Sequence, residues 1–355
     1  MVDVSYMWHG RTYGIDLGDK VSHLCALDES GAVTEETRLP TTRKHLLARF
    51  QKLERSRVVI ETGTHTNWVA ETLAACGHEV VVANARLGRA IFGNPRKDDR
   101  TDARCLAEIG RVDTRLLHPV TPRDAKCRQS LALLRGRKAL VRSRTQLINH
   151  VRGIAKSAGH RLPTRTSESF HKLPMPEELA SSLDPVVSVI AELTAKIAIL
   201  DERVEALCEL EYPQTKQLMA ISGVGPQTSL CFVLIVGDPR CFRSARAVAS
   251  YVGLTPRRDA SGARDPELPI TKAGDPLLRE LLVQCAHHML GRFGQDSDLR
   301  RFGLRLAARG HKNAKKKAVV ATARKLAVLL ASLLRSGEVY DPLHGADAAE
   351  LGRTG

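Results

Sequence analysis

The sequence contains no closely spaced cysteine pair and no long apolar run. None of the eight cysteines stands in a C-x-x-C pair, which argues against a structural zinc site and against a disulfide framework. No apolar run reaches the roughly 20 residues that a membrane helix requires, and the segment Met1–Gly10 lacks the apolar core of a secretory signal. The sequence therefore predicts a cytoplasmic protein without a membrane partner.

Acidic residues are absent from two long stretches. Lys and Arg outnumber Asp and Glu by 54 to 39, a formal net charge of +15. Between Arg135 and Lys156 there are seven basic residues and no acid, and between Leu299 and Lys325 there are ten and no acid. Two such stripes favour a nucleic-acid partner, although either stripe alone could be a solvated basic face. The predicted contacts in the stripes are Arg135, Arg137, Lys138, Arg142, Arg144, Lys312, Lys315, Lys316 and Lys317.

The first 122 residues alternate strand and helix patterns. Three strands are expected at 13–18, 22–27 and 33–39, joined by short turns. A helix at 42–53, a strand at 58–60, a helix at 67–76, a strand at 79–83 and a helix from 99 follow. This order predicts an α/β N-terminal domain, residues 1–122, with a mixed sheet of the ribonuclease H-like type.

Four carboxylates occupy chemically informative positions in this domain. Asp16 and Glu61 end apolar strand-type runs, where an unpaired carboxylate is costly unless it is solvated or binds a cation. Asp99 and Asp102 are three residues apart and share one face of the expected helix. Together the four could hold two magnesium ions that act on a phosphodiester. Asp98 is the competing ligand, although helical phase favours Asp99.

The segment Gly-Ile-Asp-Leu-Gly at 14–18 also resembles the first phosphate loop of actin-like ATPases. That alternative requires a second phosphate loop and an adenosine motif downstream, and neither is found at a suitable position. The histidines lack metal-binding i, i+4 pairs and are expected to be structural or to contact phosphate.

From residue 123 the pattern becomes helical. Apolar residues recur at helical intervals on both sides of the polar, proline-containing stretch 159–176. Residues 123–212 are therefore expected to form a helical hairpin or coiled coil, either packed on its own domain or used as a dimerising arm.

Residues 213–340 are expected to form a mainly α C-terminal domain, with a flexible tail at 341–355. Gly223 and Gly225 lie in a turn between helices whose backbone N–H groups could bind a DNA phosphate. Ser261 lies in a loop among basic residues and is either a turn serine or an activated nucleophile. The predicted nucleic-acid contacts of this region are Gly223, Gly225, Arg257, Arg258, Lys272 and Arg279.

These motifs together resemble the DEDD transposases of bacterial insertion sequences, the bridge-RNA-guided recombinases of the IS-one-ten type. The resemblance covers most of the chain. It rests on Gly-Ile-Asp-Leu-Gly (14–18), Val-Ile-Glu-Thr-Gly (59–63), Asp-Arg-Thr-Asp (99–102), Ile-Ser-Gly-Val-Gly-Pro (221–226), Tyr-Val-Gly-Leu-Thr-Pro (251–256), Ala-Ser-Gly (260–262), Ile-Thr-Lys-Ala-Gly-Asp (270–275) and Arg-Gly-His-Lys (309–312). One departure is Asp98, where the family commonly has Thr.

The resemblance implies specific roles for five residues. Asp16, Glu61, Asp99 and Asp102 would bind Mg²⁺, with Mn²⁺ as a substitute, and Ser261 would form a phosphoserine link to DNA. It also implies a structured guide RNA that pairs with donor and target double-stranded DNA. The assembly would be a homodimer and a synaptic tetramer, associated with the bacterial nucleoid when bound to DNA.

Two other functions are compatible with the same residues. A RuvC-like junction endonuclease would use the carboxylates and water without Ser261. A non-catalytic nucleic-acid-binding protein would retain the basic surfaces around a degenerate nuclease core.

Overall fold

The computed structural model describes residues 8, 10–85, 98–258, 268–310 and 312–344. The chain divides into two compact units, residues 1–125 and 126–355, and each is described by itself. Among the described residues, no helix combines the length and the apolar character needed to cross a bilayer.

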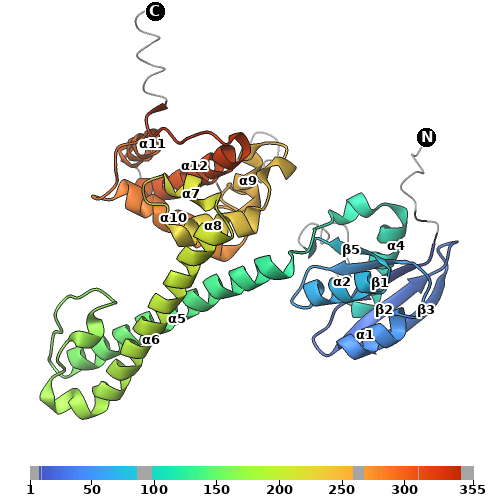
Figure 1. Ribbon diagram of the computed structural model, residues 1–355, viewed down its shortest axis with the longest axis horizontal. Helices are drawn as coiled ribbons and strands as arrows, with labels where there is room; N and C mark the ends of the chain where they lie inside the picture. The colour runs from blue at the N-terminus through green and yellow to red at the C-terminus, as the bar shows by residue number, and fades with distance from the viewer. Residues whose placement is uncertain (1–7, 9, 86–97, 259–267, 311, 345–355) are drawn as a thin grey trace, which may run out of the picture. The chain divides into compact units, whose positions relative to one another are not determined.

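The first unit is built on a five-stranded mixed sheet (Figure 1). Its strands are β1 (Thr12–Asp16), β2 (Val21–Leu27), β3 (Val33–Pro40), β4 (Arg57–Glu61) and β5 (Glu79–Ala83). They lie in the order β3-β2-β1-β4-β5, with β1 to β3 antiparallel and with β4 and β5 parallel to β1. The predicted mixed sheet is confirmed, and its strand order is compatible with a ribonuclease H-like fold.

Helices cover both faces of this sheet because the side chains of each strand alternate between the faces. Tyr13 and Ile15 of β1 pack with α1 (Arg43–Phe50) and α2 (Thr66–Ala75) in one apolar cluster. The opposite face packs against α4 (Asp99–Val112) through buried residues that include Val59, Ala103, Leu106 and Ala107. Consequently Gly14 and Asp16 lie on the face that α4 covers.

The second unit begins with two long helices, α5 (Ala125–Ser157) and α6 (Glu177–Leu210). Four buried residues of α6 recur every seven positions: Leu183, Ile190, Ile197 and Val204. Leu183 and Ile190 pack with Ile148 and Val151 of α5 in one cluster. The predicted long helices and the break between them are confirmed, and a coiled coil between chains stays a prediction.

Six further α-helices follow in the described residues of the second unit. They are α7 (Thr215–Met219), α8 (Pro226–Val236), α9 (Ala245–Tyr251), α10 (Pro276–Leu290), α11 (Asp298–Ala307) and α12 (Ala314–Ser336). Every residue of α8 from Thr228 to Val236 is buried, because this helix is apolar on all sides. Its core cluster also contains Leu131 of α5 and Val204 of α6, so the hairpin and the C-terminal helices share one core.

Candidate metal centre

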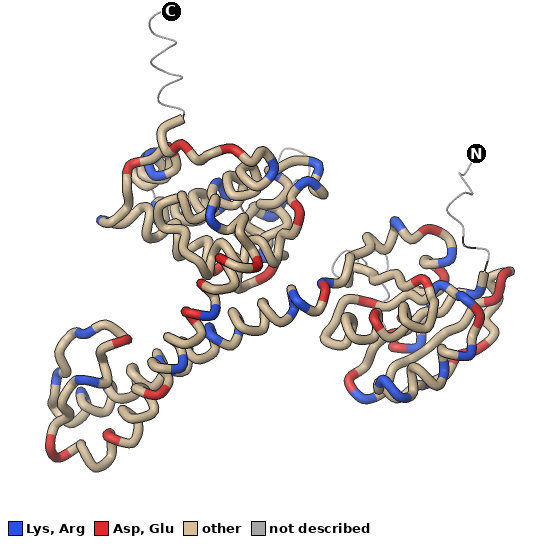
Figure 2. The backbone as a smooth tube through the Cα atoms, in the orientation of Figure 1, with Lys and Arg blue, Asp and Glu red and all other residues tan. Residues whose placement is uncertain are grey.

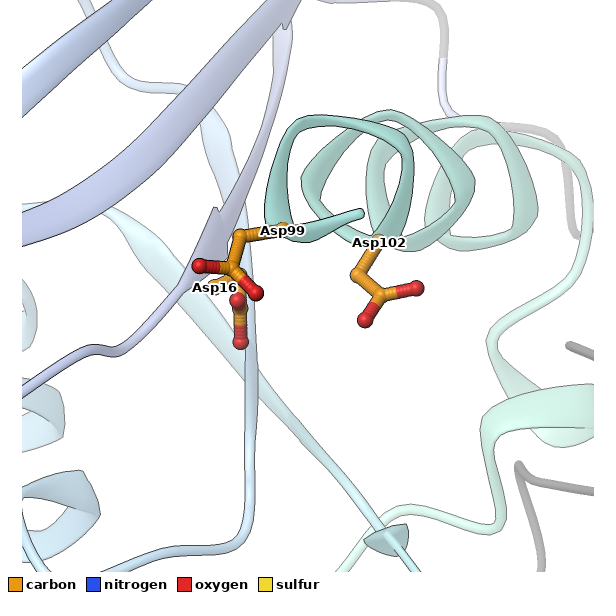
Figure 3. A group of neighbouring side chains, drawn as sticks. All are labelled: Asp16, Asp99 and Asp102. Atoms are coloured by element: carbon orange, nitrogen blue, oxygen red, sulfur yellow. The ribbon is translucent and has the colours of Figure 1, made fainter. Parts of the chain in front are cut away.

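Three of the four predicted carboxylates lie together. One oxygen from each of Asp16, Asp99 and Asp102 lies within 4.8 Å of the others. Figure 3 shows these side chains, from the end of β1 and the first turn of α4, gathered in one region. A set made only of carboxylate oxygens suits a hard divalent cation such as Mg²⁺ or Mn²⁺.

The start of α4 places its two aspartates. Asp98 is the N-cap, since its side chain accepts hydrogen bonds from Arg100 N (3.2 Å) and Thr101 Oγ1 (3.3 Å). Asp99 and Asp102 occupy the first turn, where negative charge interacts favourably with the helix dipole. The local structure favours Asp99 over Asp98 as a ligand, because Asp98 caps the helix and lies outside the carboxylate cluster.

A glycine lets α4 approach the sheet. A Cβ atom at Gly14 would lie 2.0 Å from the Ala103 carbonyl oxygen and 2.5 Å from Ala107 N. A Cβ at Gly110 would meet Val59 Cγ2 at 2.2 Å. Only glycine fits at these two crossings, so they fix the distance between β1 and the helix that carries Asp99 and Asp102.

We expect Gly14→Ala to lower the free energy of unfolding by about 1–3 kcal/mol, because the added methyl group overpacks a backbone contact. Urea denaturation measures this change. The matched control is Gly136→Ala in α5, where an added Cβ has no neighbour within 4 Å. That control should be neutral or stabilise by roughly 0.5–1 kcal/mol, since alanine favours a helix. Equal effects of the two variants would contradict the tight crossing.

Ionic hydrogen bonds, called here the Glu36 clamp, connect the N-terminal part of α4 to Glu36. Arg100 Nε donates to Glu36 Oε2 (2.6 Å) and Arg104 Nε donates to Glu36 Oε1 (2.9 Å). The hydrogen bond from Arg100, together with that from Arg104, lowers the pKa of Glu36 below its usual value. Glu36 lies on β3, so these hydrogen bonds join the edge strand of the sheet to the helix that carries the aspartates.

Glu61 lies beside the cluster without joining it. It is the last residue of β4, one position after Ile60. Because Ile60 pairs with Ile15 in the parallel ladder, the register places Glu61 beside Asp16. It shares a sheet face with Val59 and therefore with Asp16. Its carboxylate is not among the oxygens that gather within 4.8 Å of one another in the described residues.

Sequence reasoning missed two histidines near the acidic residues. His23 pairs with Asp16 across the β1–β2 ladder, and its Nε2 lies 4.0 Å from Asp99 Oδ2. His65 Nδ1 accepts a hydrogen bond from Trp68 Nε1 (3.1 Å), and its Nε2 lies 3.5 Å from Asp19 Oδ1. The register of the β1–β2 hairpin could have identified His23, because it places His23 opposite Asp16. The i, i+3 spacing that identified Asp99 and Asp102 does not detect a neighbour on another strand.

The first basic stripe is engaged mainly in internal contacts. Arg144 is only 5% exposed and donates to Glu168 (2.9 Å) and Thr194 (3.3 Å). Arg137 bonds Asp201 through its Nη2 (3.0 Å). Acids from distant parts of the chain therefore neutralise these two arginines, and their assignment to nucleic acid stays a prediction that these contacts do not favour.

The rest of the first stripe is paired more loosely. Arg135 pairs with Asp275 (3.1 Å) and Lys138 pairs with Glu280, which joins α5 to the start of α10. Arg142 is exposed. Figure 2 shows Lys and Arg recurring along α5. Much of this stripe stabilises the fold of the second unit, and Arg142 remains available to a ligand.

The loop predicted to carry Ser261 is described only at its ends. Ser261 lies outside the described residues. The ends pair as an antiparallel bridge between Pro256 and Ile270, and Arg257 N donates to Pro269 O (2.9 Å). Basic side chains at these ends are exposed: Arg257, Arg258 and Lys272.

Three other predicted contacts of this region take part in the local fold. Arg279 donates to the carbonyl oxygens of Val252 (3.0 Å) and Gly274 (3.2 Å), so its guanidinium ties the start of α10 to the segment after α9. Gly223 has a φ of +89°, and a Cβ there would lie 3.0 Å from His288 Nδ1. Gly225 is the N-cap of α8.

The second basic stripe is exposed where α12 begins. Lys312, Lys315, Lys316 and Lys317 are all exposed, and the last three lie in the first turn of the helix. Within the described part of the chain, no salt bridge is formed by Lys312, Lys315 or Lys316. Their positive charges near a helix N-terminus oppose the helix dipole, so an anion there would relieve the repulsion.

Comparisons with known proteins agree with these features. A family model described as "Transposase", of the DEDD insertion-sequence type, matches residues 13–159. A second, described as "Transposase IS116/IS110/IS902 family", matches residues 215–302. The first match contains the carboxylate cluster, and the second contains the Ser261 loop and the Gly223 turn.

Individual relatives include three bacterial proteins. The transposase of insertion sequence element IS1111A from Coxiella burnetii is 27% identical over 340 residues, covering 93% of this chain and 91% of that protein. The y4pF/y4sB transposase of Sinorhizobium fredii is 30% identical over 315 residues, covering 86% and 79%. A pilin gene-inverting protein of Moraxella lacunata is 31% identical over 134 residues, covering 38% and 40%. The chain therefore belongs to the IS116/IS110/IS902 family of DEDD transposases, enzymes that cut and rejoin DNA.

Proposed function

We propose that this chain excises and inserts its own mobile element by divalent-metal-dependent strand cleavage at Asp16, Glu61, Asp99 and Asp102. The observation that carries the proposal is the convergence of Asp16, Asp99 and Asp102, which come from two elements more than 80 residues apart in the sequence. Three ionised carboxylates so close together repel one another, and a divalent cation bound between them would offset that repulsion. The mixed sheet that holds them is, in this proposal, a ribonuclease H-like fold of the RuvC type.

Glu61 is proposed as the fourth ligand. It ends the strand next to β1, and it shares with Asp16 the face of the sheet that α4 covers. Magnesium bound by this set would polarise the phosphodiester and stabilise the charges on the attacking and leaving oxygens. The protein residues orient the ligand oxygens: the Asp98 cap, the Glu36 clamp and the Gly14 crossing all fix the start of α4.

Ser261 is proposed as the nucleophile on the basis of the family motif. Its Oγ would attack the phosphorus of the scissile phosphodiester and form a serine–phosphate ester. The bond from phosphorus to the leaving sugar oxygen breaks, and the hydroxyl proton passes to solvent or to the leaving oxygen. Attack by a DNA hydroxyl on this ester would release Ser261 and rejoin the strands. Arg257, Arg258 and Lys272 are exposed around the loop and would neutralise phosphate charge.

We also propose that a structured guide RNA pairs with donor and target DNA, and that the active assembly is a homodimer that forms a synaptic tetramer. The support is the family membership together with the exposed lysines of α12, which suit a phosphate backbone.

The test combines purified protein, plasmid DNA carrying both element ends, and a transcript of the non-coding end of the element. We expect excised and rejoined products only when Mg²⁺ and the transcript are both present. Products without the transcript would refute RNA guidance, and products in EDTA would refute metal dependence.

The exposed lysines of α12 should dominate the salt dependence of binding. Replacing Lys315, Lys316 and Lys317 together by glutamine is expected to lower the affinity for duplex DNA. The slope of log K against log salt concentration should become shallower by up to about 2.7, because three phosphate contacts are lost. Titrations at several salt concentrations measure this slope. The matched control is Lys52→Gln, an exposed lysine in the first unit. Equal slopes for the triple variant and the wild type would place the phosphate contacts elsewhere.

A further inference from the structure

The loop between α10 and α11 exposes a phenylalanine. Phe293 is 69% exposed, more than any other phenylalanine, tyrosine or tryptophan among the described residues. The chain has only seven phenylalanines, and the others in described positions are buried or half-buried. Apolar side chains exposed singly are common on protein surfaces, so the meaning of this ring depends on the backbone contacts and charges around it.

The backbone of this loop is held by specific contacts. Arg300 Nη1 donates to the carbonyl oxygens of Gly291 (2.7 Å) and Met289. A Cβ atom at Gly294 would lie 1.9 Å from the Met289 carbonyl oxygen, so the turn closes too tightly for any side chain at that position. Ser297 then caps α11, and Asp298 N donates to Pro342 O (2.8 Å). The loop is therefore a rigid support for Phe293.

A cation accompanies the exposed ring. The Arg292 guanidinium carbon lies 4.5 Å from the centroid of the Phe293 ring. Asp296, the nearest acid in the sequence, forms a salt bridge with Arg301 (2.7 Å) and does not neutralise Arg292. Because Phe293 is mostly exposed, the face of its ring that points away from Arg292 is open to a second planar group.

The charge around the loop favours a polyanion. Between Arg292 and Lys317 there are nine Lys and Arg and two Asp, an excess of seven positive charges. A small cavity beneath the loop is lined by Gln295 and Ser297 together with Ile221 and Ser222. The loop therefore adjoins the glycine-containing turn before α8, where a Cβ atom at Gly223 would lie 3.0 Å from Nδ1 of His288 in the last turn of α10.

We propose that Phe293, with Arg292 on its opposite face, stacks on an unpaired base of a bound nucleic acid. A base presents a flat π-face to the open side of the ring, and the guanidinium neutralises the adjoining phosphate. A protein partner would meet the same ring with an apolar surface, whereas the sequence that follows the ring is strongly basic. The inference rests on the nucleic-acid-binding part of the proposed function and does not depend on the metal centre.

The test measures binding of the full-length protein in EDTA to two fluorescein-labelled probes. One is a duplex of about 30 base pairs, and the other has about four central nucleotides on each strand mismatched to form a bubble. Phe293→Ala is expected to weaken bubble binding about ten-fold and to leave duplex binding within about two-fold, since one stacked base is lost. Phe293→Trp should retain the bubble affinity, and its added tryptophan fluorescence should be quenched by the bubble probe.

A second substitution separates stacking from apolar contact. Phe293→Leu keeps the apolar bulk but has no π-face, so it should behave like Phe293→Ala. A leucine variant that binds the bubble as tightly as the wild type, or an alanine variant that loses both probes equally, overturns the proposal. If the alanine variant changes only the molar mass measured by light scattering, the ring belongs to a contact between copies of the chain. None of these results depends on cleavage, so loss of the metal centre would be recognised separately, by inactivity with intact bubble binding.

Discussion

Asp102→Asn is expected to reduce strand cleavage by at least about 1,000-fold while the protein still folds and binds DNA. The substitution preserves the size of the side chain and removes the charge that a divalent cation requires. Asp102 is one of the three carboxylates that lie within 4.8 Å of one another. Cleavage of supercoiled plasmid, followed on agarose gels at saturating Mg²⁺, measures the loss. Asp16→Asn should have the same effect.

The same variant should also change the response of stability to metal. Without Mg²⁺, removing one of three crowded negative charges is expected to leave the melting temperature unchanged or to raise it. With Mg²⁺, the wild type should become more stable and Asp102→Asn should not, because ligand binding stabilises only a protein that binds the ion. Thermal melts at increasing Mg²⁺ concentration measure both effects.

Asp98→Asn is the matched control for Asp102→Asn. The two residues are four positions apart, but asparagine serves as well as aspartate at an N-cap. This variant should retain nearly full cleavage. Full activity in Asp102→Asn, or equal loss in both variants, would contradict the assignment of the ligands.

Ser261→Ala is expected to eliminate the covalent protein–DNA adduct and, with it, strand exchange. No other group replaces a nucleophile that forms a covalent intermediate, so the loss should reach the detection limit. The adduct is detected as radiolabelled DNA that migrates with the protein on a denaturing gel. Metal binding should be unchanged, because the carboxylates belong to the other unit, and DNA binding should be unchanged because every basic residue is retained.

Ser250→Ala is the control for that experiment, since Ser250 is an exposed serine of α9 a few residues before the same loop. It should form the adduct at the wild-type level. If Ser261→Ala still cleaves DNA and releases ends without an adduct, the enzyme uses water and behaves like a junction endonuclease. If the adduct persists unchanged, the nucleophile is another residue.

Much of the fold could be predicted from the sequence because the first unit follows local rules. The strands of the sheet have simple apolar patterns and short turns, so their positions agree with the structure to within a few residues. Asp99 and Asp102 could be placed on one helical face from their spacing, and the structure brings both to Asp16. The N-cap role of Asp98 follows the same local logic, although the sequence left it in competition with Asp99.

Features that depend on distant partners could not be predicted in this way. The acid-free stretch on α5 suggests a nucleic-acid surface, yet Arg144 is buried against Glu168, and Arg137 bonds Asp201. A count of charges along the chain does not reveal ion pairs between residues that are far apart in the sequence. The crossing at Gly14 and the approach of His23 to Asp99 likewise depend on how β1, β2 and α4 pack.

The most direct test of the metal centre is a crystal of the protein soaked in Mn²⁺ and measured at the manganese absorption edge. We expect an anomalous peak within about 2.0–2.5 Å of carboxylate oxygens from Asp16, Asp99 and Asp102, with Glu61 turned toward it or toward a second ion. A soaked crystal with no peak at these residues, or with the only peak elsewhere, would contradict the proposed mechanism of DNA cleavage.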